Sequence, residues 1–251
     1  MRTNDPSTPL RAGERPFDAA QGRRTTNDEP LTASDTLSSS VLGRSSYSRA
    51  DLDLASIIRG RHSVRRYHDQ PVPRELIEQV LEAARWAPSP HGRQPWRFAV
   101  LTRPESKQRL ADAMGDEWRR QLAMDGQDAA TIELRRRKSH ERILRAPAIV
   151  VPCLYLADLD VYPDADRNAA EATMAIQSLG CAVQNMLLMA YQLGLDGGWM
   201  CAPLFCPEVV GGALDLDPAL TPHALITLGY AAADPVRRDR LPLEQLVVRF
   251  D

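Results

Sequence analysis

The longest uncharged stretch of the chain, from Ala172 to Leu193, constrains the fold more than any other feature. It lies within residues 168–194, which contain no proline and are dominated by the helix formers Ala, Met, Leu and Gln. A helix that is apolar on nearly every side is buried, either in a membrane or in a large core. Six hydrogen-bonding side chains and the lack of a flanking positive cluster argue against lipid. We therefore predict a central helix here, enclosed by its own domain together with a second subunit.

Length, charge and cysteine usage narrow the class of protein. The chain has 251 residues and a formal net charge of -2, which fits one sizeable core and disfavours a non-specific nucleic-acid binder. The four cysteines form no CxxC pair, and the N-terminus lacks an apolar stretch of signal-peptide length. These features predict a cytoplasmic protein with reduced thiols, no metal site, and neither nucleic acid nor membrane as a partner.

The N-terminal segment differs in composition from the rest. Residues 1–50 are rich in Ser, Thr, Asp, Arg and Pro and show no hydrophobic periodicity, so they cannot bury enough apolar area to offset their ordering entropy. We predict a disordered tail over 1–50 and a folded domain over 51–251. A docking or regulatory role for the tail stays open beside that of a functionless extension.

Helical and strand patterns interleave along the folded domain, which predicts an α/β or α+β class. Gly197 and Gly198 lie in one expected strand and would allow close backbone approach. The helices are expected near 53–59, 73–87, 105–124, 129–144 and 168–194, and the strands near 98–101, 147–155, 195–201, 224–230 and 246–250.

Two clusters of cations each have two possible interpretations. Four arginines crowd round His62 and Ser63, where they could hold a phosphate or form a solvated basic turn. Residues 135–138 are consecutive cations, which could meet an anionic substrate but are more commonly a solvated helix face.

Dinucleotide, P-loop and zinc-protease motifs are absent from the sequence. Instead, four segments occur in a particular order: RHSVRRY (61–67), APSPHGRQPWRF (87–98), QLGLDGGW (192–199), and LGY followed by RRDRLP (237–242). In this order they resemble the FMN-dependent nitroreductase family. Further segments at 116–126, 145–152, 162–167 and 171–174 resemble one branch, the reductase domain fused to a γ-glutamyl ligase in actinobacterial coenzyme F-420 biosynthesis.

The resemblance implies an α+β nitroreductase-like fold with a central mixed sheet, surrounding helices and a homodimer that holds FMN between its subunits. The flavin N5 would carry the hydride, so no dedicated catalytic side chain is expected. The cofactor-binding residues implied are Arg61, His62, Ser63, Arg65, Pro88, Ser89, Pro90, Gly92, Cys201, Ala202, Arg238 and Arg240. The substrate-contacting residues implied are His91, Arg93, Trp118 and Arg119.

The function implied is FMN-dependent reduction of a small conjugated molecule, with a dehydro precursor of coenzyme F-420 as the specific substrate. One alternative is a general nitro or quinone reductase that uses NAD(P)H. A second alternative is a flavin-binding protein without turnover.

Overall fold

The computed structural model describes residues 48–233, 237 and 239–251. Residues 1–47 of the predicted tail lie outside this part, so its disorder stays a prediction. The described chain begins with a 3-10 helix, η1 (Arg49–Asp51), whose N-cap Ser48 accepts a hydrogen bond from the backbone N–H of Ala50.

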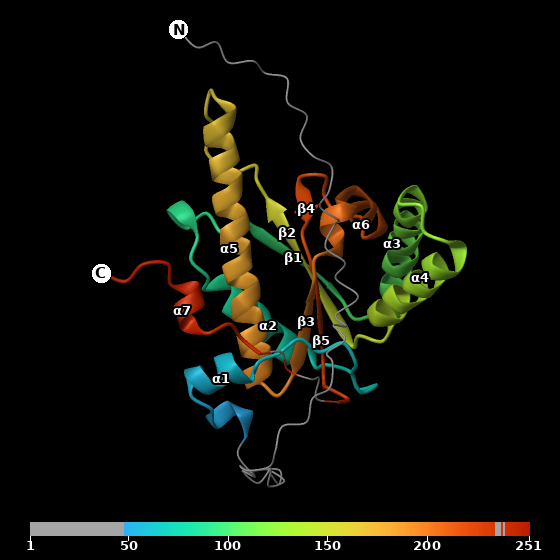
Figure 1. Ribbon diagram of the computed structural model, residues 1–251, viewed down its shortest axis with the longest axis horizontal. Helices are drawn as coiled ribbons and strands as arrows, with labels where there is room; N and C mark the ends of the chain where they lie inside the picture. Colours follow the sequence, from blue (N-terminus) through green and yellow to red (C-terminus); the bar gives the residue numbers. More distant parts are fainter. Residues whose placement is uncertain (1–47, 234–236, 238) are drawn as a thin grey trace, which may run out of the picture. The chain divides into compact units, whose positions relative to one another are not determined.

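A five-stranded sheet forms the middle of the domain (Figure 1). Its strands are β1 (Trp96–Leu101), β2 (Ala148–Tyr155), β5 (Leu225–Gly229) and β3 (Asp196–Met200) in that order, with β4 (Leu220–Pro222) paired to β2. The named strands all pair antiparallel. Among the described residues, the mixed character expected of the sheet is confined to one parallel bridge, between Ser63 and Gly197.

The predicted central helix is confirmed as α5 (Ala165–Gln192), which packs with α2 (Arg74–Arg85) on one face of the sheet (Figure 1). It begins before residue 168 because Asp164 caps it, accepting a hydrogen bond from the Arg167 N–H at 2.9 Å. The rest of the described chain covers only part of α5, however, and leaves an uncharged stripe exposed to solvent. That stripe, the α5 stripe below, consists of Thr173, Ile176, Gln177, Cys181 and Gln184.

No helix in the described ranges combines the length and the apolar character that crossing a membrane requires.

The opposite face of the sheet is covered by three helices: α3 (Pro104–Met124), α4 (Ala129–Leu144) and α6 (Pro207–Ala213) (Figure 1). Leu110 and Ile143 of these helices pack with Ile149 of β2 in this second half of the core. Lys107 is buried beside them, and its Nζ donates a hydrogen bond to the carbonyl of Ala146 at 2.8 Å. That bond anchors α3 to the start of β2.

One predicted element is wrong. The strand expected over 246–250 is absent, and the chain instead forms α7 (Leu243–Leu246) followed by irregular backbone. Val248 and Phe250 are 100% and 94% exposed, so no sheet of this chain receives them. The remaining elements are α1 (Leu54–Gly60), η2 (Pro90–Gly92) and η3 (Ala202–Phe205).

Candidate functional site

The segment 61–68 is extended backbone that is fixed at both ends by other parts of the sheet. Near its start, the Val64 N–H donates to the Gly197 carbonyl at 3.0 Å, and near its end the His68 N–H donates to the Tyr230 carbonyl at 2.9 Å. A Cβ at Gly198 would lie 2.5 Å from the Val64 carbonyl oxygen. The close backbone approach predicted for this glycine is therefore confirmed. It places residues 61–68, called the basic segment below, directly beside β3.

The two ends of the basic segment face different cations. At its first end, the pKa of Arg61 is lowered by partial burial and then by the charge of Arg240. Arg237 donates hydrogen bonds to the carbonyls of Arg59 (3.1 Å) and Gly60 (3.2 Å), which holds the C-terminal segment against the end of α1. These contacts place the segment that carries Arg240 near Arg61.

This first pair lacks a counter-charge. Among the described residues, neither Arg61 nor Arg240 has a carboxylate partner. Ser63 is exposed on the same stretch, whereas Arg238, also expected to bind the cofactor, lies outside the described residues.

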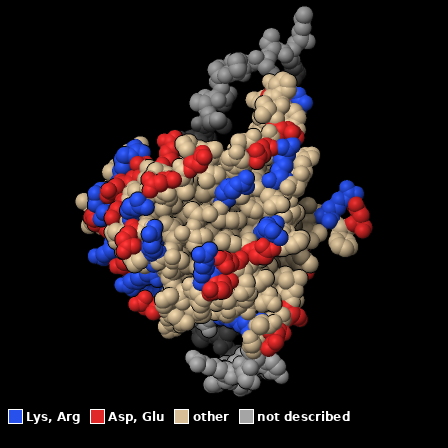
Figure 2. All heavy atoms as spheres, turned by 180° about the vertical axis from the view of Figure 1, so that it is seen from behind, with Lys and Arg blue, Asp and Glu red and all other residues tan. Residues whose placement is uncertain are grey.

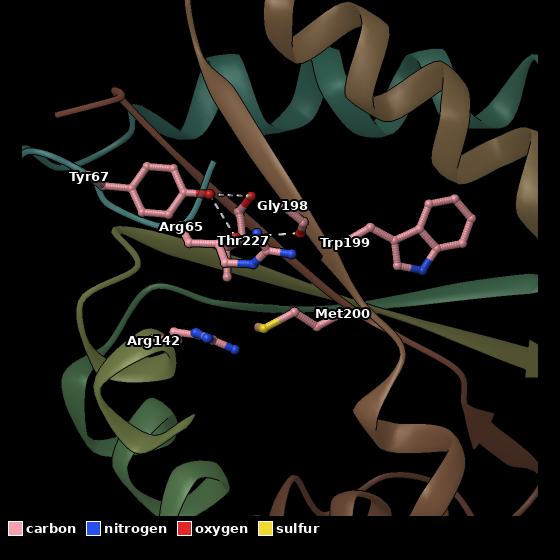
Figure 3. Close-up of a pocket in the computed structure, with 7 residues that line it drawn as sticks. All are labelled: Arg65, Tyr67, Arg142, Gly198, Trp199, Met200 and Thr227. Atoms are coloured by element: carbon pink, nitrogen blue, oxygen red, sulfur yellow. Dashed lines mark hydrogen bonds between the residues drawn. The ribbon is translucent and has the colours of Figure 1, made fainter. Parts of the chain in front are cut away.

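At the second end, Arg65 faces Arg142 of α4. The pKa of Arg142 is lowered by partial burial and then by the charge of Arg65. Both line a small pocket with Tyr67, Gly198 and Met200, and Figure 3 shows Arg142 extending from α4 toward the Met200 side chain. The Tyr67 hydroxyl donates to the Val64 carbonyl at 2.9 Å and lies 2.7 Å from Thr227 Oγ1, which fixes the pocket's rear wall.

His62 connects the basic segment to α1 and α5. Its Nδ1 lies 2.8 Å from the Gly60 carbonyl, and its ring meets the ring of Tyr191 edge-on at 6.3 Å. Arg49 also lies over the Tyr191 ring, at 4.3 Å, and pairs with the buried carboxylate of Asp196 at 3.2 Å. Arg49 belongs to the predicted tail, so no sequence pattern connects it with the site.

The turn at 88–94 is held in an unusual conformation. His91, Gly92 and Gln94 have φ values of 55°, 65° and 51°, a region that side-chain-bearing residues rarely adopt. The Ser89 hydroxyl accepts a hydrogen bond from the Gln94 N–H at 3.1 Å, and Arg93 binds Asp160 at 2.6 Å. The turn therefore has a fixed shape while Pro88, His91 and Gly92 stay exposed.

The turn and the basic segment lie far apart within one chain. A ring nitrogen of His91 is within 4.8 Å of a carboxylate oxygen of Glu171, whereas His62 meets Tyr191. Both contacts are with α5, and at 1.5 Å per residue these two points are about 30 Å apart along its axis. A single chain therefore does not bring the two predicted halves of the flavin site together.

The other predicted residues lie at two places. Cys201 and Ala202 are exposed immediately after β3, beside the pocket of Figure 3. Trp118 and Arg119 lie on α3, where Arg119 pairs with Glu133 of α4 at 3.0 Å. In the described part of the chain no pocket or polar contact joins these two α3 residues to the basic segment.

The fold, together with the basic segment beside β3, defines an oxidoreductase of the nitroreductase class. The chain belongs to the nitroreductase family, whose profile matches residues 58–230. The family resemblance predicted from the sequence is thus confirmed, while the nearer likeness to the coenzyme F-420 reductase domain stays a prediction.

Individual relatives agree with this assignment. A protein of Thermus thermophilus named NADH dehydrogenase is 32% identical in an alignment of 221 residues. The match covers 78% of this chain and 96% of that protein. A nitroreductase-like protein of Desulfovibrio desulfuricans, crystallised with FMN, is 28% identical with a TM-score of 0.59, over 78% of this chain and 96% of its own. A BluB-like flavoprotein of Clostridium difficile shares the fold, with a TM-score of 0.64 at 23% identity over 80% and 100% of the two chains.

Proposed function

We propose that the protein catalyses hydride transfer from NAD(P)H to a small conjugated acceptor such as a quinone or nitroaromatic compound, with FMN as the bound carrier. FMN supplies the N5 atom that accepts and releases the hydride. For a quinone acceptor, a proton from solvent completes the quinol, and NAD(P)⁺ leaves. The observation that carries this proposal is that Arg237 binds the carbonyls of Arg59 and Gly60 and so places Arg240 near Arg61, beside β3, while neither Arg61 nor Arg240 has a carboxylate partner among the described residues.

The residues present fit FMN. Two guanidinium groups and the Ser63 hydroxyl supply the charge-assisted hydrogen bonds that a phosphate requires. His62 contributes a buried Nε2 that has no partner among the described residues, so it is available to a polar atom of the cofactor. These side chains bind and orient, and none of them has to form a covalent intermediate.

We infer further that each FMN site is built from two copies of the chain. The basic segment and the 88–94 turn are about 30 Å apart along α5, so one copy's turn completes the other copy's site. The α5 stripe supports this arrangement, because it is uncharged and open. So does the C-terminal end, whose exposed apolar residues require a cover: Leu241, Leu243, Leu246, Val248 and Phe250.

The dehydro precursor of coenzyme F-420 is the more specific acceptor that we propose. It is supported by the sequence segments at 116–126, 145–152, 162–167 and 171–174. Turnover of this precursor, compared with that of a simple benzoquinone, separates the specific from the general reductase.

The test of the reaction class is spectroscopic. The purified protein is incubated with FMN, freed of excess cofactor and mixed anaerobically with NADH or NADPH. We expect the flavin absorbance to bleach and then to return when a quinone is added. Protein that retains FMN but does not bleach with either donor would be the flavin-binding protein without turnover, and protein that retains no FMN would refute the assignment.

A further inference from the structure

A cleft next to the pocket of Figure 3 is lined by five cations and one carboxylate. We call it the cationic cleft; its charged residues are Arg65, Arg66, Lys138, Glu141, Arg142 and Arg145. It lies between the second end of the basic segment and the C-terminal end of α4.

The five cations of the cleft are not compensated. Among the described residues none of them takes part in an ion pair. Elsewhere on α3 and α4, Arg120 pairs with Glu117 at 2.6 Å and Arg136 with Asp116 at 3.5 Å, whereas Arg135 and Arg137 have no ion pair among the described residues but do not line the cleft. Figure 2 shows positive and negative side chains interspersed over the surface. The cationic cleft therefore differs from the ordinary charged face of α3 and α4.

Helix electrostatics explain only part of this cluster. Lys138, Arg142 and Arg145 follow one face of the last turns of α4, where cations interact favourably with the helix dipole. Arg65 and Arg66, however, belong to a distant segment that the sheet fixes against them. Like charges held together in this way repel one another, and the charge of Arg65 adds to partial burial, the larger cause, in lowering the pKa of Arg142. A bound anion would relieve that repulsion.

The position of the cleft indicates which molecule brings the anion. It shares Arg65, Tyr67 and Arg142 with the pocket that reaches Gly198 and Met200 of β3. Arg61, which faces Arg240, is about 13 Å away from Arg65 along the extended backbone. The FMN phosphate expected at Arg61 and Arg240 therefore leaves Lys138, Arg142 and Arg145 free for another group, while Arg65, expected to bind the cofactor, lines both this cleft and the pocket beside it.

We propose that the cationic cleft binds an oxyanion group, a carboxylate or a phosphate, of the molecule that exchanges hydride at this site. The inference rests on the proposed function, because it assigns a substrate class to the same site. The oxyanion that we assign is either the acidic group of an acceptor or the 2′-phosphate of NADPH, and not the pyrophosphate, which NADH and NADPH share. The shared chemistry is bidentate guanidinium recognition of a planar or tetrahedral anion.

The kinetic test compares two charge-matched double variants of the full-length, FMN-loaded protein. Arg142→Gln/Arg145→Gln removes two cleft cations, and Arg109→Gln/Arg120→Gln removes two exposed, ion-paired arginines of α3. The acceptors are a carboxylated benzoquinone and unsubstituted benzoquinone, each with NADH as donor. NADPH and NADH are then compared with the neutral acceptor.

We expect the cleft variant to raise KM about tenfold or more for the carboxylated quinone or for NADPH, with changes below about twofold for benzoquinone and NADH. The substrate whose KM rises, either the carboxylated quinone or NADPH, identifies the source of the oxyanion. The α3 control should change neither, and Arg142→Lys/Arg145→Lys should recover part of the loss, because it retains the charge. Equal effects on charged and neutral substrates, or no effect on any, would overturn the proposal.

A binding measurement separates this proposal from the reaction itself. Inorganic phosphate is titrated into each variant and followed by calorimetry, with and without FMN. We expect the cleft variant to lose a phosphate site that the α3 control keeps, and equal binding by the two would count against the cleft. If the wild-type chain fails to retain FMN, the proposed function fails, whereas the phosphate comparison still decides whether the cleft is an anion site.

Discussion

Arg61 and Arg240 are brought together because Arg237 binds the carbonyl groups at the end of α1. We expect Arg61→Ala and Arg240→Ala each to weaken FMN binding by ~1.5–3 kcal/mol, the contribution of a hydrogen bond to a charged group. Flavin fluorescence titration measures the dissociation constant. Arg74→Ala is the control, since Arg74 is exposed and pairs with Glu78 of its own helix. Unchanged affinity in both variants would remove the phosphate site from this position.

Gly198 controls how closely the basic segment approaches β3. We expect Gly198→Ala to destabilise the protein by roughly 1–3 kcal/mol, because the new Cβ would collide with the Val64 carbonyl and with Thr227 Oγ1. Urea unfolding measures the free energy. Gly211→Ala in α6 is the matched control, since nothing lies within 4 Å of its Cβ position, and it should leave stability unchanged or raise it slightly. Similar effects of the two substitutions would contradict this account.

Some site residues were accessible from the sequence and others were not. Arg61, Ser63, Arg65 and Arg240 could be proposed from the sequence because they belong to segments whose order along the chain resembles a family, and their role in binding FMN stays a prediction. Arg142 could not, since it resembles its neighbours on a charged helix and differs only through its packing against Arg65. Its role depends on a tertiary contact that has no signature in local sequence.

At the scale of the elements, the α5 stripe is the surface that we expect to hold the dimer together. Gln177→Glu/Cys181→Glu should shift the protein toward monomer, because each copy would bury like charges against the other. The unfolding free energy of the monomer should barely change, since both positions are exposed. Sedimentation equilibrium measures the association.

The control for this prediction adds the same charge elsewhere. Ala129→Glu/Ala130→Glu places two carboxylates in the exposed first turn of α4, where the helix dipole favours them. It should leave the dimer intact. Dimers of equal strength in both variants would locate the interface away from the stripe.

Elements with strong patterns were predictable, and those defined by partners were not. The uncharged run of α5 and the apolar run of β2 identified both elements, because α5 has a buried face along its length and β2 is buried on nearly all its length. The strand expected at 246–250 failed because a β-branched run forms a strand only where a neighbour supplies hydrogen bonds. β4 and α6 were missed, being three and seven residues long, too short for a periodic signal.

At the scale of the whole molecule, a shared site predicts that two defective chains can repair each other. One variant is Arg61→Ala/Arg240→Ala; the other is Gly92→Val, which places a β-branched residue at a φ of 65° and reshapes the turn. Each homodimer should bind FMN poorly. Co-expressed in equal amounts, the two chains should form mixed dimers with one intact site, so purified mixed dimers should bind about half as much FMN as the wild-type dimer.

The measurement is flavin content of affinity-purified mixed dimers that carry two different tags. The control is a mixture of the separately purified homodimers, measured before their subunits have time to exchange, and it should show no recovery. If the mixed dimers also bind no FMN, each site is contained within one chain and the inference of a shared site is wrong.

The distance between Glu171 and Tyr191 on α5 makes this helix a ruler for the assembly. A ruler with 3.6 residues per turn cannot be lengthened by one residue, since each addition also rotates everything beyond it by about 100°. The shortest insertion that nearly restores the direction is about seven residues, and it would move the two halves apart by about 10 Å. Loops around the sheet can therefore drift in length during evolution, whereas the middle of α5 can change only in residue type.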